Sequence, residues 1–376
     1  MRRARPLTRR ALLIAPAAAA GLLALVVSAC GVSGDGGSPS GSLTGMLGEV
    51  PDTPANRSLL AWVDVAAARE LAGIASPATD DEEALTVFSG KSGPVQALLP
   101  VFMNSQAAEL DAWRTEVGFT VNDIDQSIDA GVAPEMTAVA RGRIAPEEVK
   151  EAVESDPSWK DELDTGDHDG VEYWRWLDDD EMDVARVTPT RSLGNSLRLQ
   201  AEDGQVRWTR TDETMHDSID AGAGDTDTLA DVDELAVVAE ALEDQDAYQA
   251  YLTADPGPFS VDRLPRTSPE AKEQAAAGAL EPWTAAGAGD AVDGDTAVGV
   301  LVLTHEDAGT AATNEKRLRE LLESGRSPRE DRPYADAYEV RALERKGSTL
   351  ILTVEQDRAQ QLMIETVIER SLVLHR

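Results

Sequence analysis

The sequence predicts an α+β protein with antiparallel or mixed sheets and packed helices. Three observations carry this prediction. Strand-like segments rich in β-branched and aromatic residues occur in both parts of the chain, and amphipathic helical segments lie between them. Residues 196–201 and 205–211, separated by Glu202-Asp203-Gly204, form the strongest hairpin pattern. The regular strand–helix alternation of a doubly wound parallel sheet is not seen.

Residues 49–254 are predicted to form a first α+β unit. Pro146 and two acids open a good helix at 145–155, and Pro100 kinks or divides a helical pattern at 94–117. The predicted elements are strands at 58–65, 136–140 and 171–177, the hairpin above, and helices at 66–71, 94–117, 145–155 and 231–252.

Residues 255–295 are rich in Gly, Ala and Pro and predict a connection between units. A second βαββα unit is predicted over residues 296–376. Its elements are strands at 297–304, 337–343 and 349–354 and helices at 310–324 and 358–372. The similar order of elements in the two units leaves a structural duplication as one interpretation, although their sequences do not establish it.

The first 29 residues have the three parts of an export signal. Five arginines precede an apolar stretch of 17 residues at 11–27, and the small residues Ser28 and Ala29 follow. This stretch is short for a bilayer span of about 20 residues, so we expect a cleaved signal over residues 1–29. Residues 30–48 hold seven glycines and predict a flexible linker.

Val27-Ser28-Ala29-Cys30 resembles the lipobox of bacterial lipoproteins, an aliphatic residue and two small residues before a cysteine. The resemblance implies that Cys30 receives a lipid and becomes the mature amino terminus. It also implies a membrane partner through that lipid and a place on the extracytoplasmic face of the cell membrane. The alternative is an ordinary thiol close to a secretory cleavage site.

Thr8-Arg9-Arg10-Ala11-Leu12-Leu13 resembles the twin-arginine export motif, in which two arginines precede apolar residues. The resemblance implies that Arg9 and Arg10 are read by an export system for folded proteins. The alternative is that both belong to a general basic start. Arginine far outnumbers lysine and alanine is abundant, as is typical of the high-GC genomes of actinobacteria.

Without residues 1–29 the chain carries 29 basic and 69 acidic residues, a net charge of −40. Such a surface repels phosphate backbones, so the sequence excludes nucleic acid as a partner. Cys30 is the one cysteine. With its sulfur taken by lipid, no thiol remains for a disulfide, a zinc–thiolate site or a cysteine nucleophile.

Two local patterns resemble ligand loops and fail in detail. Ser89-Gly90-Lys91-Ser92 resembles the end of a phosphate-binding loop, but Leu85 stands where the pattern needs glycine. Residues 164–172 resemble a calcium loop, but Thr165 and Trp176 replace two required acids. We therefore expect a Gly/Ser turn and solvated acidic loops. The acids at 225, 227, 290, 293 and 295 are interpreted in the same way, with weak calcium binding at one loop as the alternative.

The histidines at 168, 216, 305 and 375 show no metal-ligand spacing. His305, at the end of a predicted strand beside two acids, is expected to make a local ion pair rather than a catalytic or metal site. No serine-nucleophile motif occurs. Trp174 and Trp176 share one face of a strand and Tyr173 the other, and we expect the two tryptophans to be core rather than a sugar-binding surface.

These observations predict no catalytic residue, no metal ligand and no cofactor. We expect a lipid-anchored, non-catalytic binding or structural protein of the cell envelope, which meets an envelope component or a protein partner. Two alternatives remain. One is a solute-binding protein of an ABC transporter, for which a deep cleft between lobes would argue. The other is an envelope-polymer hydrolase, for which two opposed carboxylates about 5–10 Å apart would argue.

Overall fold

A computed structural model describes residues 42–75, 81–91, 93–179, 181–263, 269–327 and 332–376. The described residues form one compact unit. Among the described residues, no helix has both the length and the apolar character that crossing a membrane would require.

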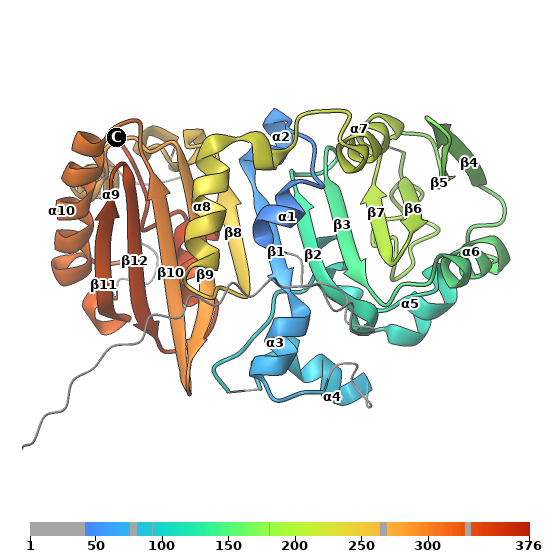
Figure 1. Cartoon of the computed structure of the whole chain (residues 1–376), viewed down its shortest axis with the longest axis horizontal. Coiled ribbons are helices and arrows are strands. Elements are labelled where there is room, and N and C mark those ends of the chain that lie inside the picture. Colours follow the sequence, from blue (N-terminus) through green and yellow to red (C-terminus); the bar gives the residue numbers. More distant parts are fainter. Residues whose placement is uncertain (1–41, 76–80, 92, 180, 264–268, 328–331) are drawn as a thin grey trace, which may run out of the picture. The chain divides into compact units, whose positions relative to one another are not determined.

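Twelve strands of the described chain form a single sheet in the order β11-β12-β10-β9-β8-β1-β2-β3-β7-β6-β5-β4 (Figure 1). The strands are β1 (Leu60–Asp64), β2 (Ile124–Ala130), β3 (Thr137–Gly142), β4 (Leu163–His168), β5 (Val171–Trp176), β6 (Leu197–Glu202), β7 (Gln205–Thr209), β8 (Gln249–Thr253), β9 (Ala285–Asp293), β10 (Thr296–Thr304), β11 (Tyr338–Lys346) and β12 (Thr349–Gln356). Every pairing between these strands is antiparallel, which confirms the predicted α+β class.

Helices cover both faces of the sheet, because alternate residues of each strand point to opposite faces. The α-helices are α1 (Leu43–Leu47), α2 (Pro54–Ser58), α3 (Val65–Leu71), α4 (Asp81–Leu85), α5 (Leu110–Val117), α6 (Pro146–Ser155), α7 (Asp212–Ala223), α8 (Asp233–Glu243), α9 (Pro269–Gly278), α10 (Ala308–Ser324) and α11 (Gln361–Met363). On one face α1 and α8 pack over β1, β8, β9 and β10, and α7 packs over β3, β4 and β7. The opposite face carries α3, α5, α6, α10 and α11.

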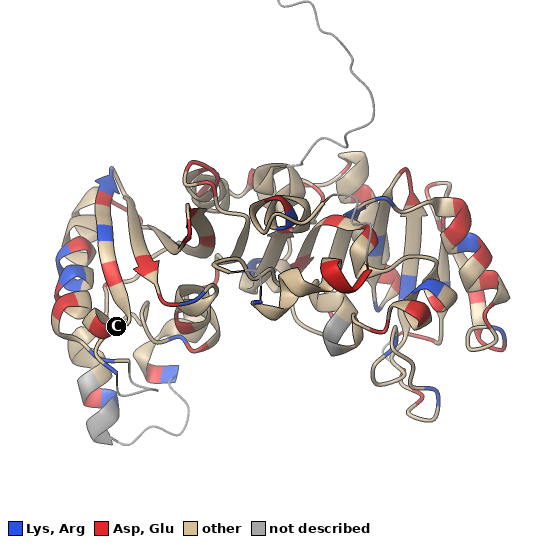
Figure 2. Cartoon of the chain, turned by 90° about the horizontal axis from the view of Figure 1, so that it is seen from below, with Lys and Arg blue, Asp and Glu red and all other residues tan. Residues whose placement is uncertain are grey.

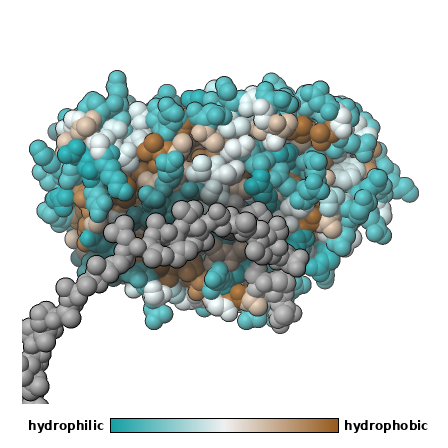
Figure 3. All heavy atoms as spheres, in the orientation of Figure 1, coloured by the Kyte–Doolittle hydropathy of each residue, from teal (hydrophilic) through white to brown (hydrophobic). Residues whose placement is uncertain are grey.

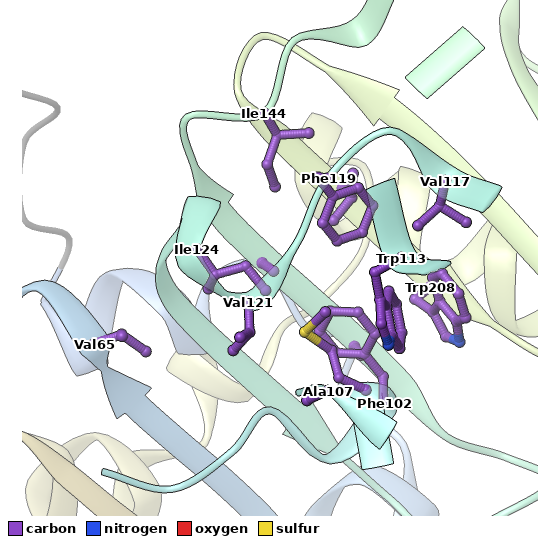
Figure 4. Close-up of a cluster of buried hydrophobic side chains, with 14 of the residues drawn as sticks. Val65, Phe102, Ala107, Trp113, Val117, Phe119, Val121, Ile124, Ile144 and Trp208 are labelled. Atoms are coloured by element: carbon purple, nitrogen blue, oxygen red, sulfur yellow. The ribbon is translucent and has the colours of Figure 1, made fainter. Parts of the chain in front are cut away.

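An aromatic cluster forms the centre of the core between the sheet and α5. The ring of Trp113, from α5, lies 5.8 Å from Trp208 of β7, 6.3 Å from Phe102 and 6.2 Å from Phe119 (Figure 4). Trp113 is fully buried, and its indole nitrogen donates a hydrogen bond to the Gln106 carbonyl at 3.1 Å. Aromatic residues are few in the chain, and four of them are buried together in this cluster, where they exclude water.

Several elements differ from the sequence prediction. Leu43, Met46 and Leu47 form a buried face of α1, so the predicted linker to residue 48 is too long. The predicted helix at 231–252 is α8 followed by β8, because Ala247 and Tyr248 lead into a strand between β1 and β9. Residues 255–295, expected as a connection, contain α9 and β9.

Two other predicted helices are shorter than their patterns. Pro100 is followed by a 3-10 helix at Val101–Gln106, and only α5 of the 94–117 pattern is α-helical. At the carboxyl end, α11 continues as a π-helix over Ile364–Ile368 instead of an α-helix to residue 372. The strands predicted near 58–65, 136–140, 171–177, 297–304, 337–343 and 349–354 are present, as are the hairpin and the helices near 66–71, 145–155 and 310–324.

Charged residues are spread over all parts of the described chain (Figure 2). Figure 2 shows acidic residues on elements throughout the described chain, with basic residues between them. Figure 3 shows one face that is mostly hydrophilic, with separate smaller hydrophobic patches.

Candidate functional site

The predicted lipidation and export residues lie outside the described residues. These are Arg9, Arg10, Val27, Ser28, Ala29 and Cys30. The described chain begins at Ser42, whose side chain caps α1 by accepting a hydrogen bond from the Gly45 amide. Candidate sites in the described chain therefore come from the sheet and its helices.

Two of the four histidines meet where α7 crosses the β4–β5 hairpin. His168 is the last residue of β4, and Asp169 and Gly170 make the turn with φ angles of 51° and 86°. Positive φ at both turn residues suits a tight hairpin, and Asp-Gly is one of the sequences that adopts it readily. Residues 164–172 are thus a hairpin and not the calcium loop that their spacing resembles.

Helix α7 has a clear start and stop. The Thr211 side chain accepts a hydrogen bond from the Thr214 amide, two acids occupy the first turn, and Gly224 ends the helix in a left-handed conformation. Asp212, His216 and Asp220 are spaced by four residues and lie on one face of this helix. Met215 and Ile219 pack against Tyr173 of β5 and fix the helix over the hairpin.

We call His168, Asp169, His216 and Asp220 the His–Asp cluster. His168 Nε2 lies 2.7 Å from Asp220 Oδ1. The two imidazole rings are stacked, with centroids 4.2 Å apart and planes within 8°. One ligand atom from each of His168, Asp169 and Asp220 lies within 4.8 Å of the others, an arrangement that could hold a metal ion. Side chains of His168 and Asp220 keep 23% and 30% of their surface exposed, so solvent reaches the cluster.

A second layer of contacts holds the cluster in place. The Tyr173 hydroxyl lies 3.1 Å from His216 Nε2 and donates to Asp212 at 3.1 Å. Arg198 Nε donates to Asp212 at 2.7 Å. Burial alone would raise the pKa of Asp212, but the hydrogen bond and charge of Arg198, together with Tyr173 and Arg175, outweigh it and leave the pKa below its usual value. Burial, together with the negative charge of Asp212, raises the pKa of Tyr173 to about 12, so its hydroxyl stays protonated.

Sequence reasoning missed the cluster because its members come from two elements 50 residues apart. The signal that could have found α7 is the capping sequence at Thr211, followed by Asp212 and Glu213. The spacing of four residues between Asp212, His216 and Asp220 would then have placed the three side chains on one face of the helix. Their partner His168 could not be assigned, since it depends on the hairpin packing under α7.

His305 has a structural role instead of the predicted ion pair. It is buried, its Nδ1 lies 2.8 Å from the Ser348 carbonyl oxygen, and Asn314 Nδ2 donates to its Nε2 at 2.9 Å. Burial lowers the pKa of His305. The neutral ring therefore joins the end of β10, the start of β12 and α10.

The two strand tryptophans are core residues, as predicted. Trp174 and Trp176 belong to the cluster under α5 and α6, and Tyr173 points to the other face. The guanidinium of Arg191 lies 4.4 Å from the Trp176 ring and 4.2 Å from the Trp159 ring. An arginine between two indoles is a cation–π arrangement that stabilises the loop before β6.

Two buried carboxylates lie in the middle of the sheet. Asp290 was interpreted as part of a solvated acidic turn, but it lies in β9 and accepts hydrogen bonds from Gln249 and Gln356, both at 2.7 Å. Asp129, in β2, accepts from the amides of Val101 and Phe102 at 3.0 and 2.8 Å. Burial raises the pKa of Asp129 to about 7 and that of Asp290 to about 6. The hydrogen bonds to Asp129 hold residues 101–102 against β2, and those to Asp290 join β9 to β8 and β12. Both acids are therefore structural.

Four surface cavities lined by described residues have volumes of about 330 to 620 Å³, and two of them lie beside the aromatic cluster and beside α7. A cavity of about 330 Å³ is lined by apolar residues that include Val101, Phe102, Met136 and Trp208. A second, of about 370 Å³, is more polar and is lined by Asp179, Thr211, Glu213 and Asp217, among others. Neither brings together a nucleophile, a base and an oxyanion donor among its described lining residues.

The described chain thus defines an α+β protein with one twelve-stranded antiparallel sheet and an exposed His–Asp cluster at one end of it. No protein-family model matches the chain, and no curated protein matches its sequence. Among solved structures, one crystal form of TP0453 is similar with a TM-score of 0.43 and 10% identity over 86% of this chain and 96% of that chain. Another form of TP0453 gives 0.41 and 9% over 87% and 97%. Scores below 0.5 do not establish a shared fold.

Proposed function

We propose that this protein is an extracytoplasmic lipoprotein, anchored to the cell membrane through Cys30, whose sheet domain acts as a non-catalytic binding or structural component of the cell envelope. The observation that carries the proposal is the sequence Val27-Ser28-Ala29-Cys30 behind a basic start and an apolar stretch. It supplies a cysteine at the position where lipoproteins are modified and cleaved.

The distance between the anchor and the domain supports this location. Helix α1 begins at Leu43, so thirteen peptide steps separate it from Cys30. An extended chain of that length spans at most about 45 Å. The domain would therefore stay close to the membrane surface, where it meets envelope polymers, membrane lipids and proteins attached to the same membrane.

Replacing Cys30 with alanine is expected to abolish anchoring. The thiol is the atom that accepts the lipid, so the variant has no acceptor and the lipoprotein peptidase leaves it uncleaved. Labelled palmitate should enter the wild-type protein and not Cys30→Ala, and the variant should migrate at precursor size. Equal palmitate incorporation in both proteins would contradict the proposed anchor.

We also propose export by the twin-arginine route. Changing Arg9 and Arg10 together to lysine keeps the positive charge but removes the paired guanidinium groups that such a system reads. Precursor should then accumulate inside the cell, while a protein exported by the general secretion route is unaffected. Arg2→Lys with Arg3→Lys is the matched control, since it makes the same exchange outside the motif. Normal surface levels of the Arg9/Arg10 variant would show a general basic start.

The binding part of the proposal is supported by where the titratable groups lie. Asp129, Asp290 and His305 hold neighbouring segments together, and the His–Asp cluster is left accessible to solvent. Incubation of the detergent-solubilised protein with cell-wall glycans, peptides and ester substrates should give no turnover. Turnover that disappears when a single acid or histidine is replaced, with the fold intact, would overturn this part.

A further inference from the structure

We propose that the His–Asp cluster is a binding site for a divalent transition metal ion of the zinc class, with His168, Asp169 and Asp220 as its ligands. This goes beyond the proposed function, because a metal site does not follow from anchoring or from an unspecified binding role. The sequence predicted no metal ligand, since two of the ligands come from the β4–β5 hairpin and the third from α7.

The donor atoms favour this class of metal. One imidazole nitrogen and two carboxylates form the set, and their donor atoms lie within 4.8 Å of one another. Catalytic zinc sites use three protein ligands of this kind and leave a fourth position for water, whereas structural zinc sites use four protein ligands. Calcium and magnesium prefer oxygen ligands alone, and an imidazole therefore shifts the preference toward zinc and its neighbours. Among the described residues no cysteine occurs, so no thiol from that part of the chain changes this choice.

Two of the three ligands need only a small adjustment. Zinc–nitrogen and zinc–oxygen bonds of about 2.0–2.1 Å at a tetrahedral angle put two ligand atoms roughly 3.3 Å apart. His168 Nε2 and Asp220 Oδ1 are already 2.7 Å apart. A metal ion takes the place of the proton between them, which moves to Nδ1 or to solvent. The two atoms then separate by about 0.6 Å, a distance that side-chain rotation of the partly exposed Asp220 supplies.

The His168 ring is held in one plane before a metal arrives. His216 stacks on it with a centroid distance of 4.2 Å, and His216 is itself fixed by the Tyr173 hydroxyl at 3.1 Å. Tyr173 is buried between β5 and α7 against Met215 and Ile219. Ligands that are oriented by neighbours lose less conformational freedom when they bind, so His216 acts here as a positioning residue.

The exposed turn supplies the third ligand and the open coordination position. Asp169 is exposed and immediately follows His168. Asp169 and Gly170 both have positive φ angles, which is the backbone conformation of a tight hairpin turn. The β6–β7 hairpin has the same kind of turn at Asp203-Gly204, with φ angles of 42° and 80°. Asp203 lacks a histidine beside it, and this turn is therefore the matched control for Asp169.

The test has two measurements on the full-length protein in detergent. Calorimetry monitors a titration with ZnCl₂, and thermal unfolding is compared with and without zinc. We expect one zinc ion per chain and a higher unfolding temperature with zinc. His168→Gln and Asp220→Asn should each weaken binding at least tenfold, Asp169→Asn should weaken it, and Asp203→Asn should leave it unchanged. Magnesium and calcium at the same concentration should raise the unfolding temperature less than zinc, by an amount that equal ionic strength accounts for.

Three results would overturn the proposal. The first is no saturable zinc binding at millimolar zinc. The second is zinc binding that is unchanged in His168→Gln and Asp220→Asn, which would place the ion on other carboxylates. The third is calcium binding as tight as zinc binding with the same loss in Asp220→Asn, which would make the site one of carboxylates alone. If a variant at 168 or 220 fails to fold, Asp169→Asn on the exposed turn decides the question against Asp203→Asn.

Discussion

Replacing Trp113 with alanine is expected to destabilise the protein by about 3–5 kcal/mol, as for other fully buried large aromatic side chains. Trp113 is completely buried and its ring contacts Phe102, Phe119 and Trp208 (Figure 4). The substitution removes this packing, leaves a cavity and leaves the Gln106 carbonyl without its indole donor. Since the stability of a folded domain is about 5–15 kcal/mol, roughly a fifth of it or more would be lost.

Urea denaturation followed by circular dichroism measures this change. Val184→Ala is the control, since Val184 is 75% exposed and its truncation should stay within about 0.5 kcal/mol of wild type. A Trp113→Ala midpoint equal to that of the control would show that the aromatic cluster does not stabilise the sheet.

Replacing Asp129 with asparagine is expected to change how stability depends on pH. The pKa of Asp129 is raised to about 7 by burial, against about 3.9 for an unfolded aspartate. The folded state therefore binds more protons between these values, and stability falls as pH rises through this window. The contribution is fully present below pH 4 and lost above pH 7. The Val101 and Phe102 amides donate to different oxygens of Asp129, so asparagine keeps an acceptor for one of them and has no proton to lose.

The quantity to measure is the unfolding free energy of wild type minus that of Asp129→Asn at pH 5 and at pH 8. This difference should decrease by about 3 kcal/mol over that range. Asp290 and the many exposed acids titrate in both proteins, so their effects cancel. Asp203→Asn is the control substitution, because Asp203 lies in an exposed turn. A constant difference for Asp129→Asn would mean that the carboxyl titrates normally.

Local patterns predicted much of the fold. The hairpin around Asp203-Gly204, the helix opened by Pro146 and the apolar strand β10 all depend on residues close in sequence. Strand β9 was missed for a physical reason. Gly287 and Gly289 lie under Val238 and Leu242 of α8, where a Cβ would stand 2.4 Å and 3.0 Å from their side-chain carbons. The packing of α8 on β9 requires small residues in the strand, and a segment rich in small residues is typical of a connection, so the sequence predicted one.

The candidate site could be predicted only in part. The sequence drew attention to Asp167, Asp169 and Gly170 as a turn with acids, and the turn is present. It assigned no ligands, because His168 acquires its partners from α7 and from the ring of His216. Asp290 was predicted to be solvated, because it lies close to the Gly294-Asp295 turn in the sequence. In the structure three hydrogen bonds hold it inside the sheet.

The order of the strands also constrains when the protein can fold during its synthesis. Strands β2 to β7 assemble beside β1 from residues up to Thr209, but the other side of β1 pairs with β8, where Leu60 lies opposite Leu252. Until the ribosome has released residue 253, β1 presents an unpaired edge of backbone donors and acceptors, which invites pairing with other chains. A chain that crossed the membrane unfolded would close this edge outside the cell. A chain that folded before export would close it in the cytoplasm, where chaperones can shield it.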